Sequence, residues 1–215
     1  MRVLRPFLVA YLVVLLLMVW FEERLIFFPA PYNAADAVWR PAGLEFEDAW
    51  FTADDGAKLH GWYCPVDEPE AVILFAHGNA GHLAWRAEAI RNLQRELHCS
   101  VLIFDYRGYG RSEGEPSERG VLRDVRAAHA WLIERSGRPA EEIVLMGRSL
   151  GGGVVLDLAA ETSAAAVVVE STFTSLPDVA AVHYPWLPVR TLMRSQLNNL
   201  QRLAEYQGPI FFSHG

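Results

Sequence analysis

Cysteine is scarce in this chain. Its 215 residues contain only Cys64 and Cys99, too few for a disulfide framework and without the spacing of a metal-binding motif. We therefore expect two half-buried thiols and no metal site. Nothing else in the sequence calls for a metal or an organic cofactor, so no cofactor is expected.

Positive charge is also scarce. Lys58 is the single lysine, and 19 basic residues stand against 26 acidic ones, for a formal net charge of −7. Nucleic acid is excluded as a partner because phosphate binding needs a basic face. Apolar residues are plentiful instead, at 52% of the chain. At this length they suffice for one sizeable domain and not for two.

An uncharged run of sixteen residues, Pro6–Phe21, lies near the N-terminus. As a helix it would span about 24 Å, a little less than the ~30 Å hydrocarbon core of a bilayer. Trp20 suits a membrane interface. A cleaved signal peptide would need small residues near its end, and a buried core helix would show a polar face. Neither is present, so an uncleaved membrane anchor over 1–28 is favoured over both alternatives.

The charges on either side of this run predict its orientation. Arg2 and Arg5 precede it, whereas Glu22, Glu23 and Arg24 follow it with mixed signs. Positive residues favour the cytoplasmic side of a membrane. We therefore expect a single-pass protein of the cell membrane, with its N-terminus in the cytoplasm and the remainder outside.

Beyond the anchor, the pattern predicts a linker and one domain. Residues 29–43 hold three prolines and scattered alanines, typical of a linker. Two aromatic-rich segments flank Asp54-Asp55-Gly56 and predict a β-hairpin. Short apolar runs then alternate with amphipathic helical stretches, which predicts an α/β fold with a mostly parallel sheet covered on both faces. The expected strands are Glu45–Thr52, Lys58–Cys64, Val72–Ala76, Val101–Phe104, Ile143–Met146, Ala165–Val169 and Ile210–Phe212; the expected helices are His82–His98, Glu118–Arg135 and Leu150–Glu161.

The alternation breaks at residues 171–208, within the domain expected over 44–215. This stretch is long for a connection in a compact domain and contains Tyr184-Pro185-Trp186-Leu187-Pro188. We interpret it as a lid over the site and call it the lid segment. An ordinary crossover helix with an extended lead-in is the alternative.

The motif Gly147-Arg148-Ser149-Leu150-Gly151 marks a candidate nucleophile. A predicted strand precedes it and a predicted helix follows it, which is the context of a nucleophile elbow. The tight turn leaves no room for a Cβ at its glycines. Ser149 is therefore predicted to be the nucleophile of a hydrolase.

Two backbone N–H groups are predicted to form an oxyanion hole. The N–H of Leu150 lies at the start of the helix after the serine, where helix geometry favours negative charge. The loop His77-Gly78-Asn79-Ala80-Gly81 follows an earlier predicted strand, and the N–H of Asn79 is the natural second donor.

Two other polar residues end predicted strands without being assigned a catalytic role. His77 is expected to fix the oxyanion loop by hydrogen bonding. Asp105 is expected to pair with an arginine or with backbone amides and to hold the glycine-rich loop after it. That loop lacks the Lys-Ser/Thr of a phosphate-binding loop.

The motifs HGNAG, FDYRGYGRSEGEPSE, GRSLGG and ESTFTS occur in this order, and together they resemble the α/β-hydrolase superfamily. From about residue 25 onward the chain is similar to single-pass membrane serine hydrolases of the "α/β-hydrolase domain-containing" type and their bacterial relatives. The resemblance implies a triad in the order Ser…Asp…His. It also implies hydrolysis of ester or thioester substrates, often acyl or lipid ones.

The chain departs from that family after Pro209–Gly215. The triad aspartate and histidine are expected beyond this strand and have no matching position. Glu170 and His183 are the residues that could substitute, as orienting acid and as base. The expectation is a truncated hydrolase that lacks its last strand and helix and is inactive as 215 residues. A non-catalytic membrane-anchored scaffold is the alternative function.

Overall fold

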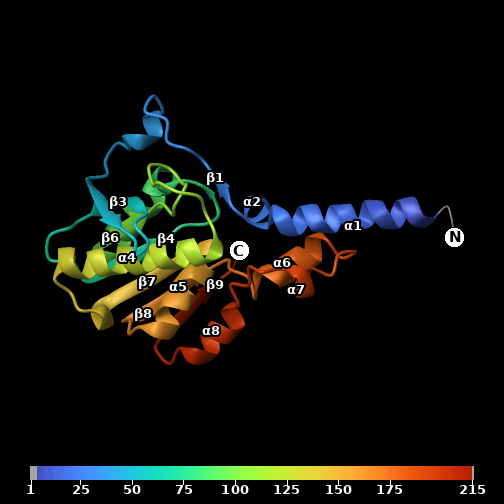
Figure 1. The fold of residues 1–215 in the computed structure, drawn as a ribbon. Coiled ribbons are helices and arrows are strands. Elements are labelled where there is room, and N and C mark those ends of the chain that lie inside the picture. Colours follow the sequence, from blue (N-terminus) through green and yellow to red (C-terminus); the bar gives the residue numbers. More distant parts are fainter. Residues whose placement is uncertain (1–3, 215) are drawn as a thin grey trace.

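A computed structural model describes residues 4–214 of the chain (Figure 1). Within that range the central sheet has seven strands in the order β2-β3-β6-β4-β7-β8-β9. The first two pairings are antiparallel and the remaining four are parallel. The expected α/β fold with a mostly parallel sheet is confirmed. The strands are β2 (Glu47–Thr52), β3 (Lys58–Cys64), β4 (Ala71–Ala76), β6 (Cys99–Phe104), β7 (Ile143–Arg148), β8 (Ala166–Glu170) and β9 (Ile210–Ser213).

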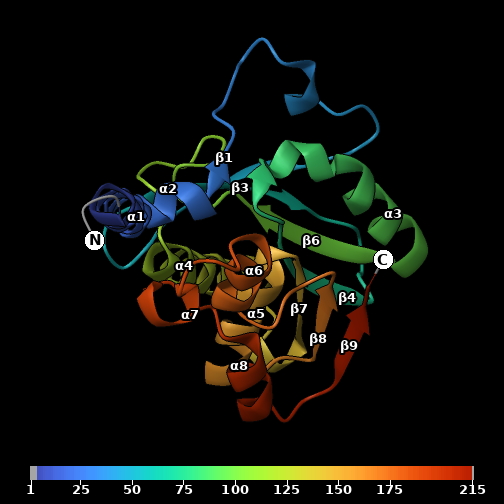
Figure 2. The ribbon, with the colours of Figure 1, turned by 90° about the vertical axis from the view of Figure 1, so that its right-hand side faces the viewer.

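Helices cover both faces of this sheet (Figure 2). Along β4, Val72 and Leu74 belong to one buried cluster, whereas Ile73 and Phe75 belong to the other. Successive side chains of a strand point to opposite faces, so a strand buried on both sides needs an unbroken apolar run. One face carries α4 (Glu118–Ser136), α5 (Leu150–Glu161) and α8 (Asn199–Glu205), and the other carries α3 (Ala87–Leu97).

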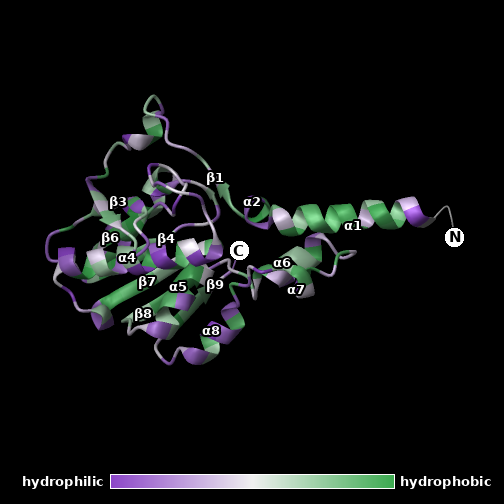
Figure 3. Cartoon of the chain, viewed as in Figure 1, coloured by the Kyte–Doolittle hydropathy of each residue, from purple (hydrophilic) through white to green (hydrophobic). Residues whose placement is uncertain are grey.

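The N-terminal helices project from the body of the molecule (Figure 1). Helix α1 (Leu4–Trp20) is followed by α2 (Glu22–Ile26), and α1 is apolar along most of its length (Figure 3). Its 17 residues correspond to about 25 Å. In the part of the chain that the structure describes, no helix combines the length and the apolar character needed to cross a membrane. The expected transmembrane helix is therefore not supported. Arg2, one of the charges behind the orientation, lies outside the described residues.

The stretch expected to be a linker contacts the domain. Strand β1 (Phe28–Pro29) pairs in parallel with β5 (Ala80–Gly81), which belongs to the oxyanion loop. A short 3₁₀ helix, Ala37–Trp39, follows. The Trp39 ring is buried and stacks on His82 at a centroid distance of 4.4 Å.

The lid segment contains α6 (Leu176–His183), α7 (Val189–Leu192) and α8. The first two helices lie beside α1, away from the sheet (Figure 1). Helix α8 instead packs against α5 on the face of the sheet. The segment thus divides into a pair of helices near the N-terminal helices and one helix that covers the sheet.

Strand β9 lies at one end of the strand order and pairs with β8 alone. Its Phe211 and Phe212 side chains are 63% and 51% exposed. The expectation that one further strand and helix are missing stays a prediction.

Candidate active site

Ser149 occupies the turn between β7 and α5. Its φ of 53° and ψ of −114° lie outside the regions that side chains with a Cβ adopt freely, a strain of about 1–3 kcal/mol. Hydrogen bonds hold this conformation. The Ser149 N–H donates to the Glu170 carbonyl at 2.8 Å, and its carbonyl accepts from the Thr172 hydroxyl at 2.8 Å. The candidate nucleophile is therefore fixed by the end of the neighbouring strand β8.

The glycines of the elbow allow strand and helix to approach closely. A Cβ on Gly147 would lie 2.2 Å from the carbonyl oxygen of Gly151, and one on Gly151 would lie 1.9 Å from that of Ala76. Both contacts are with backbone atoms. Both positions therefore require glycine because a Cβ has no room there, as the sequence predicted.

The oxyanion loop runs directly beside the nucleophile. A Cβ on Gly78 would lie 3.6 Å from the Ser149 Cβ. Leu150 is the first residue of α5, so its N–H has no acceptor within the helix. Ser149, Leu150 and Asn79 line one cavity. The structure therefore brings together the three residues predicted for the site.

The side chain of Asn79 binds the N-terminal part of the chain. Its Oδ1 accepts from the Phe28 N–H at 3.1 Å and from the Tyr109 hydroxyl at 2.7 Å, and its Nδ2 donates to the Ile26 carbonyl. These bonds occupy the side-chain amide, so only the backbone of Asn79 remains for the predicted oxyanion hole. Sequence reasoning missed this role because 51 residues separate Asn79 from Phe28.

His77 holds the oxyanion loop in place through hydrogen bonds. Its ring is fully buried, and its Nδ1 donates to the Gly78 carbonyl at 2.7 Å. The Tyr106 hydroxyl donates to the carbonyl of His77 at 2.8 Å. The predicted loop-fixing role is confirmed, and His77 is not among the residues that line the cavity.

Asp105 is buried and accepts from the Leu83 N–H at 2.7 Å, as expected for a partner of backbone amides. The nearby arginine has other partners. Arg107 donates from its guanidinium to Asp124 and Asp55, each at 2.8 Å, and its backbone N–H donates to Asp124 as well. Burial raises the pKa of Asp124, although the hydrogen bonds from Arg107 oppose that effect. This network holds the start of the glycine-rich loop.

The cavity at Ser149 has a volume of about 430 Å³, within the range of small-molecule sites. One wall comes from α1 and α2, and the other from α6, α7 and the residues between them. Its lining is mostly aliphatic and aromatic. The sequence predicted a lid on this site but gave no sign that the N-terminal helices form the opposite wall.

The two residues considered as substitutes for the triad lie in different places. His183 ends α6, is exposed and lines the cavity. The carboxylate of Glu170 stands 3.9 Å from the Arg148 guanidinium. Among residues 4–214, no histidine ring forms a hydrogen bond with Ser149. The described residues thus hold a candidate nucleophile and candidate oxyanion donors without a histidine hydrogen-bonded to Ser149.

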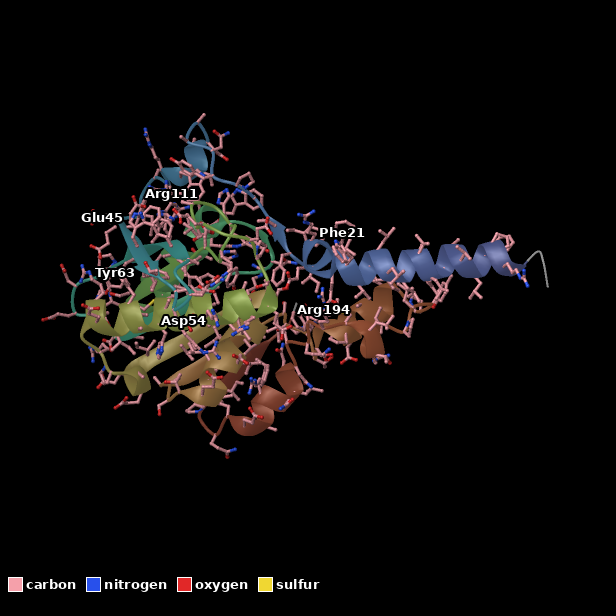
Figure 4. All side chains as sticks on the ribbon, in the orientation of Figure 1. Phe21, Glu45, Asp54, Tyr63, Arg111 and Arg194 are labelled. Atoms are coloured by element: carbon pink, nitrogen blue, oxygen red, sulfur yellow. The ribbon has the colours of Figure 1, made fainter. Side chains whose placement is uncertain are left out.

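A buried carboxylate joins the N-terminal helices to the lid. Glu22 is 5% exposed and accepts from the backbone N–H groups of Arg194 and Ser195, at 3.1 and 2.7 Å. Arg194 also donates to the Val19 carbonyl at 3.0 Å. Figure 4 shows Arg194 at the junction between these helices and the lid. Burial pushes the pKa of Glu22 upward, but the backbone hydrogen bonds outweigh it and leave that pKa below its ordinary value.

Replacing Glu22 by alanine is expected to loosen the lid. The change leaves two N–H groups without an acceptor, at a cost of about 1.5–3 kcal/mol, so their hydrogen exchange should accelerate roughly 10- to 100-fold. Because the pKa of Glu22 is lowered on folding, its contribution is complete above the ordinary value of 4.5 and is lost as the pH falls below it. Hydrogen–deuterium exchange at Arg194 and Ser195 measures both effects. Glu23→Ala, at the exposed neighbour, is the control, and equal exchange in the two variants would contradict the assignment.

Comparison with known proteins agrees with this architecture. The family model described as "alpha/beta hydrolase fold" matches residues 71–207. An uncharacterized protein of Mycobacterium tuberculosis is 40% identical over 205 residues, covering 93% of this chain and 71% of its own length. The alpha/beta hydrolase domain-containing protein WAV2 of Arabidopsis thaliana is 36% identical over 220 residues, with the same two shares.

Solved structures show the same fold at lower identity. An alpha-beta hydrolase from Vibrio vulnificus matches with a TM-score of 0.68 and 23% identity, covering 78% of this chain and 63% of that one. An esterase from Pyrococcus furiosus matches with a TM-score of 0.65 and 20% identity, covering 86% of this chain and 75% of its own. At these identities the likeness concerns the fold alone.

Proposed function

The chain belongs to the alpha/beta hydrolase fold family, and from this we propose that it is a serine hydrolase of ester or thioester substrates that acts through an acyl-enzyme at Ser149. One observation carries the proposal. Ser149 stands on a positive-φ elbow and lines an apolar cavity together with Asn79 and Leu150.

The proposed reaction has two steps. In the first, Ser149 Oγ bonds to the substrate carbonyl carbon and gives its proton to a base, and the carbonyl oxygen takes the negative charge. The N–H groups of Asn79 and Leu150 would stabilise that charge by on the order of 3 kcal/mol each. The tetrahedral intermediate then expels the alcohol or thiol, which takes the proton from the base. In the second step, water gives a proton to the base and bonds to the acyl carbon; the bond to Ser149 Oγ then breaks, the carboxylic acid leaves, and Oγ takes the proton back from the base.

The proposed mechanism also requires a base and an acid that orients it. A serine hydroxyl without a base stays protonated and reacts slowly. The family resemblance implies a triad acid and base later in the chain than the nucleophile, and we propose that a longer form of this protein supplies them. His183 is the candidate within the described residues, since it lines the same cavity.

Membrane attachment belongs to the same proposal. Along α1, side chains are exposed on several sides of the helix, and burying such a surface in lipid is favourable. The substrate would then be an acyl ester or lipid met at the cell membrane. The orientation with the N-terminus in the cytoplasm and the hydrolase domain outside needs a crossing and stays a prediction. Exposed apolar side chains of α1 include Phe7, Leu8, Val9, Leu12, Val13, Leu16 and Trp20.

A fluorophosphonate probe tests the nucleophile. The longer form should form a covalent adduct at Ser149, detected by peptide mass spectrometry, because the probe needs an activated serine. Ser149→Ala should abolish labelling, while Ser163→Ala, at an exposed serine of the same domain, should leave it unchanged. The 215-residue chain should label little or not at all.

A non-catalytic scaffold is the second candidate function. It is favoured by one observation, that no described histidine ring is hydrogen-bonded to Ser149. Equal labelling of the wild type and Ser149→Ala, or no labelling of the longer form, would support the scaffold and contradict the hydrolase.

A further inference from the structure

The cavity at Ser149 is built from parts of the chain that are far apart in sequence. Leu15, Met18 and Val19 line it from α1, and these are half-buried residues of an otherwise exposed helix. Val179 and Ala180 line it from α6. The three α1 residues therefore face the lid helices across the cavity, and do not pack against the central sheet.

Two polar side chains of the cavity, Glu22 and Asn79, are occupied by other parts of the chain. The carboxylate of Glu22 is occupied by the N–H groups of Arg194 and Ser195. The side-chain amide of Asn79 is occupied by Ile26, Phe28 and Tyr109. The reactive end at Ser149 is thus continuous with an aliphatic lining, which fits a ligand that has a carbonyl at one end and hydrocarbon beyond it.

The cavity also extends along the N-terminal helices. Its lining runs from Ile26 back to Leu15, a stretch of about 16 Å at helical rise. In Figure 1, α6 and α7 lie beside the part of α1 nearer the domain, and α1 continues beyond them. The Tyr11 and Trp186 rings lie 6.3 Å apart, and the Tyr11 hydroxyl donates to the Trp186 carbonyl. The two walls therefore stay in contact on the side where α1 leaves the domain.

We propose that this cavity binds one long, unbranched acyl chain of a lipid ester, held between α1 on one side and the lid helix α6 on the other. The N-terminal helices then form a wall of the substrate site as well as an attachment to lipid. This inference rests on the proposed function for the reaction at Ser149. The acyl-chain site itself does not depend on that chemistry.

Fatty-acid binding tests the site without requiring catalysis. Saturated fatty acids from octanoate to hexadecanoate, kept below their micelle-forming concentrations, would displace cis-parinaric acid from the Ser149→Ala chain. Burying each methylene contributes a nearly constant free energy, so affinity should rise about fourfold per methylene until the cavity is filled. Affinity that does not change with chain length would overturn the proposal.

Two variants place the bound chain between the two walls. Val19→Phe and Ala180→Phe each remove space from one wall, and each should weaken hexadecanoate binding about fifteenfold, the equivalent of two methylenes, with octanoate unchanged. Leu16→Phe and Val182→Phe add the same ring on exposed faces of the same helices and should change neither affinity. If Val19→Phe behaves like Leu16→Phe, α1 is not a wall and the proposal is wrong.

The outcomes for this inference and for the proposed function are separable. Chain-length-dependent binding without fluorophosphonate labelling of the longer form would contradict the hydrolase and keep the acyl site. Labelling at Ser149 together with a fatty-acid affinity that does not depend on chain length would support the hydrolase and contradict the acyl-chain site.

Discussion

Gly151→Ala is expected to leave little folded protein. The added Cβ would lie 1.9 Å from the Ala76 carbonyl oxygen and 2.5 Å from its carbonyl carbon. Ala76 ends β4, which is paired on both sides by β6 and β7 and cannot yield. Helix α5 would have to move away from the sheet and carry its buried side chains with it. Overpacking usually costs about 1–3 kcal/mol. A clash with backbone atoms should cost more than that, and the free energy of unfolding of a typical protein is only about 5–15 kcal/mol.

Gly153→Ala is the matched control in the same helix. Its Cβ would lie 2.9 Å from the Oδ1 of Asn199, a side-chain atom and not part of the sheet backbone, and alanine favours the helix over glycine by about 1 kcal/mol. Urea unfolding followed by tryptophan fluorescence, in a mild detergent because α1 is apolar, measures both variants. Similar midpoints for Gly151→Ala and the wild type would refute the packing argument.

Asp124→Ala is expected to cost about 3–5 kcal/mol of folding free energy, the usual effect of removing one partner of a buried ion pair. Asp124 is fully buried and accepts from the backbone N–H and the guanidinium of Arg107. Without it, a buried N–H and part of a buried cation lose their acceptor. Asp55 would still accept a hydrogen bond from Arg107, so the positive charge of the arginine would be only partly neutralised.

A surface pair provides the comparison for this result. Arg138 and Glu142, four residues apart in the chain, form an ion pair with side chains 46% and 49% exposed. Glu142→Ala should cost no more than about 0.5 kcal/mol. The same urea measurement applies, and comparable losses in Asp124→Ala and Glu142→Ala would show that burial does not set the strength of the Arg107 network.

Much of the fold could be predicted because it depends on local pattern. Helix α5 has the predicted bounds, and the run Val167–Val169 lies in a strand of the parallel sheet. The helix expected from His82 begins instead at Ala87, after the 3₁₀ turn Leu83–Arg86. The Leu83 N–H is held by the Asp105 carboxylate. A bond across 22 residues leaves no trace in local periodicity.

The candidate site likewise has one part that the sequence predicts and one part that it does not. Ser149 and Leu150 share one turn and Asn79 lies on a strand-following loop, so their meeting follows from sheet topology. The contact of Glu22 with Arg194 and Ser195 spans about 172 residues and could not be predicted. The transmembrane interpretation relied on an apolar run of about 24 Å, on Trp20 and on the flanking charges; among the described residues, no helix is long and apolar enough to cross a membrane.

The three hydrogen bonds of the Asn79 side chain have a mechanical consequence. They connect Ile26 and Phe28, at the base of the N-terminal helices, to the loop beside the nucleophile. If α1 is attached to lipid, as proposed, a load on α1 would reach that loop through these few residues. Tension at the attachment would then be transmitted to the loop beside Ser149.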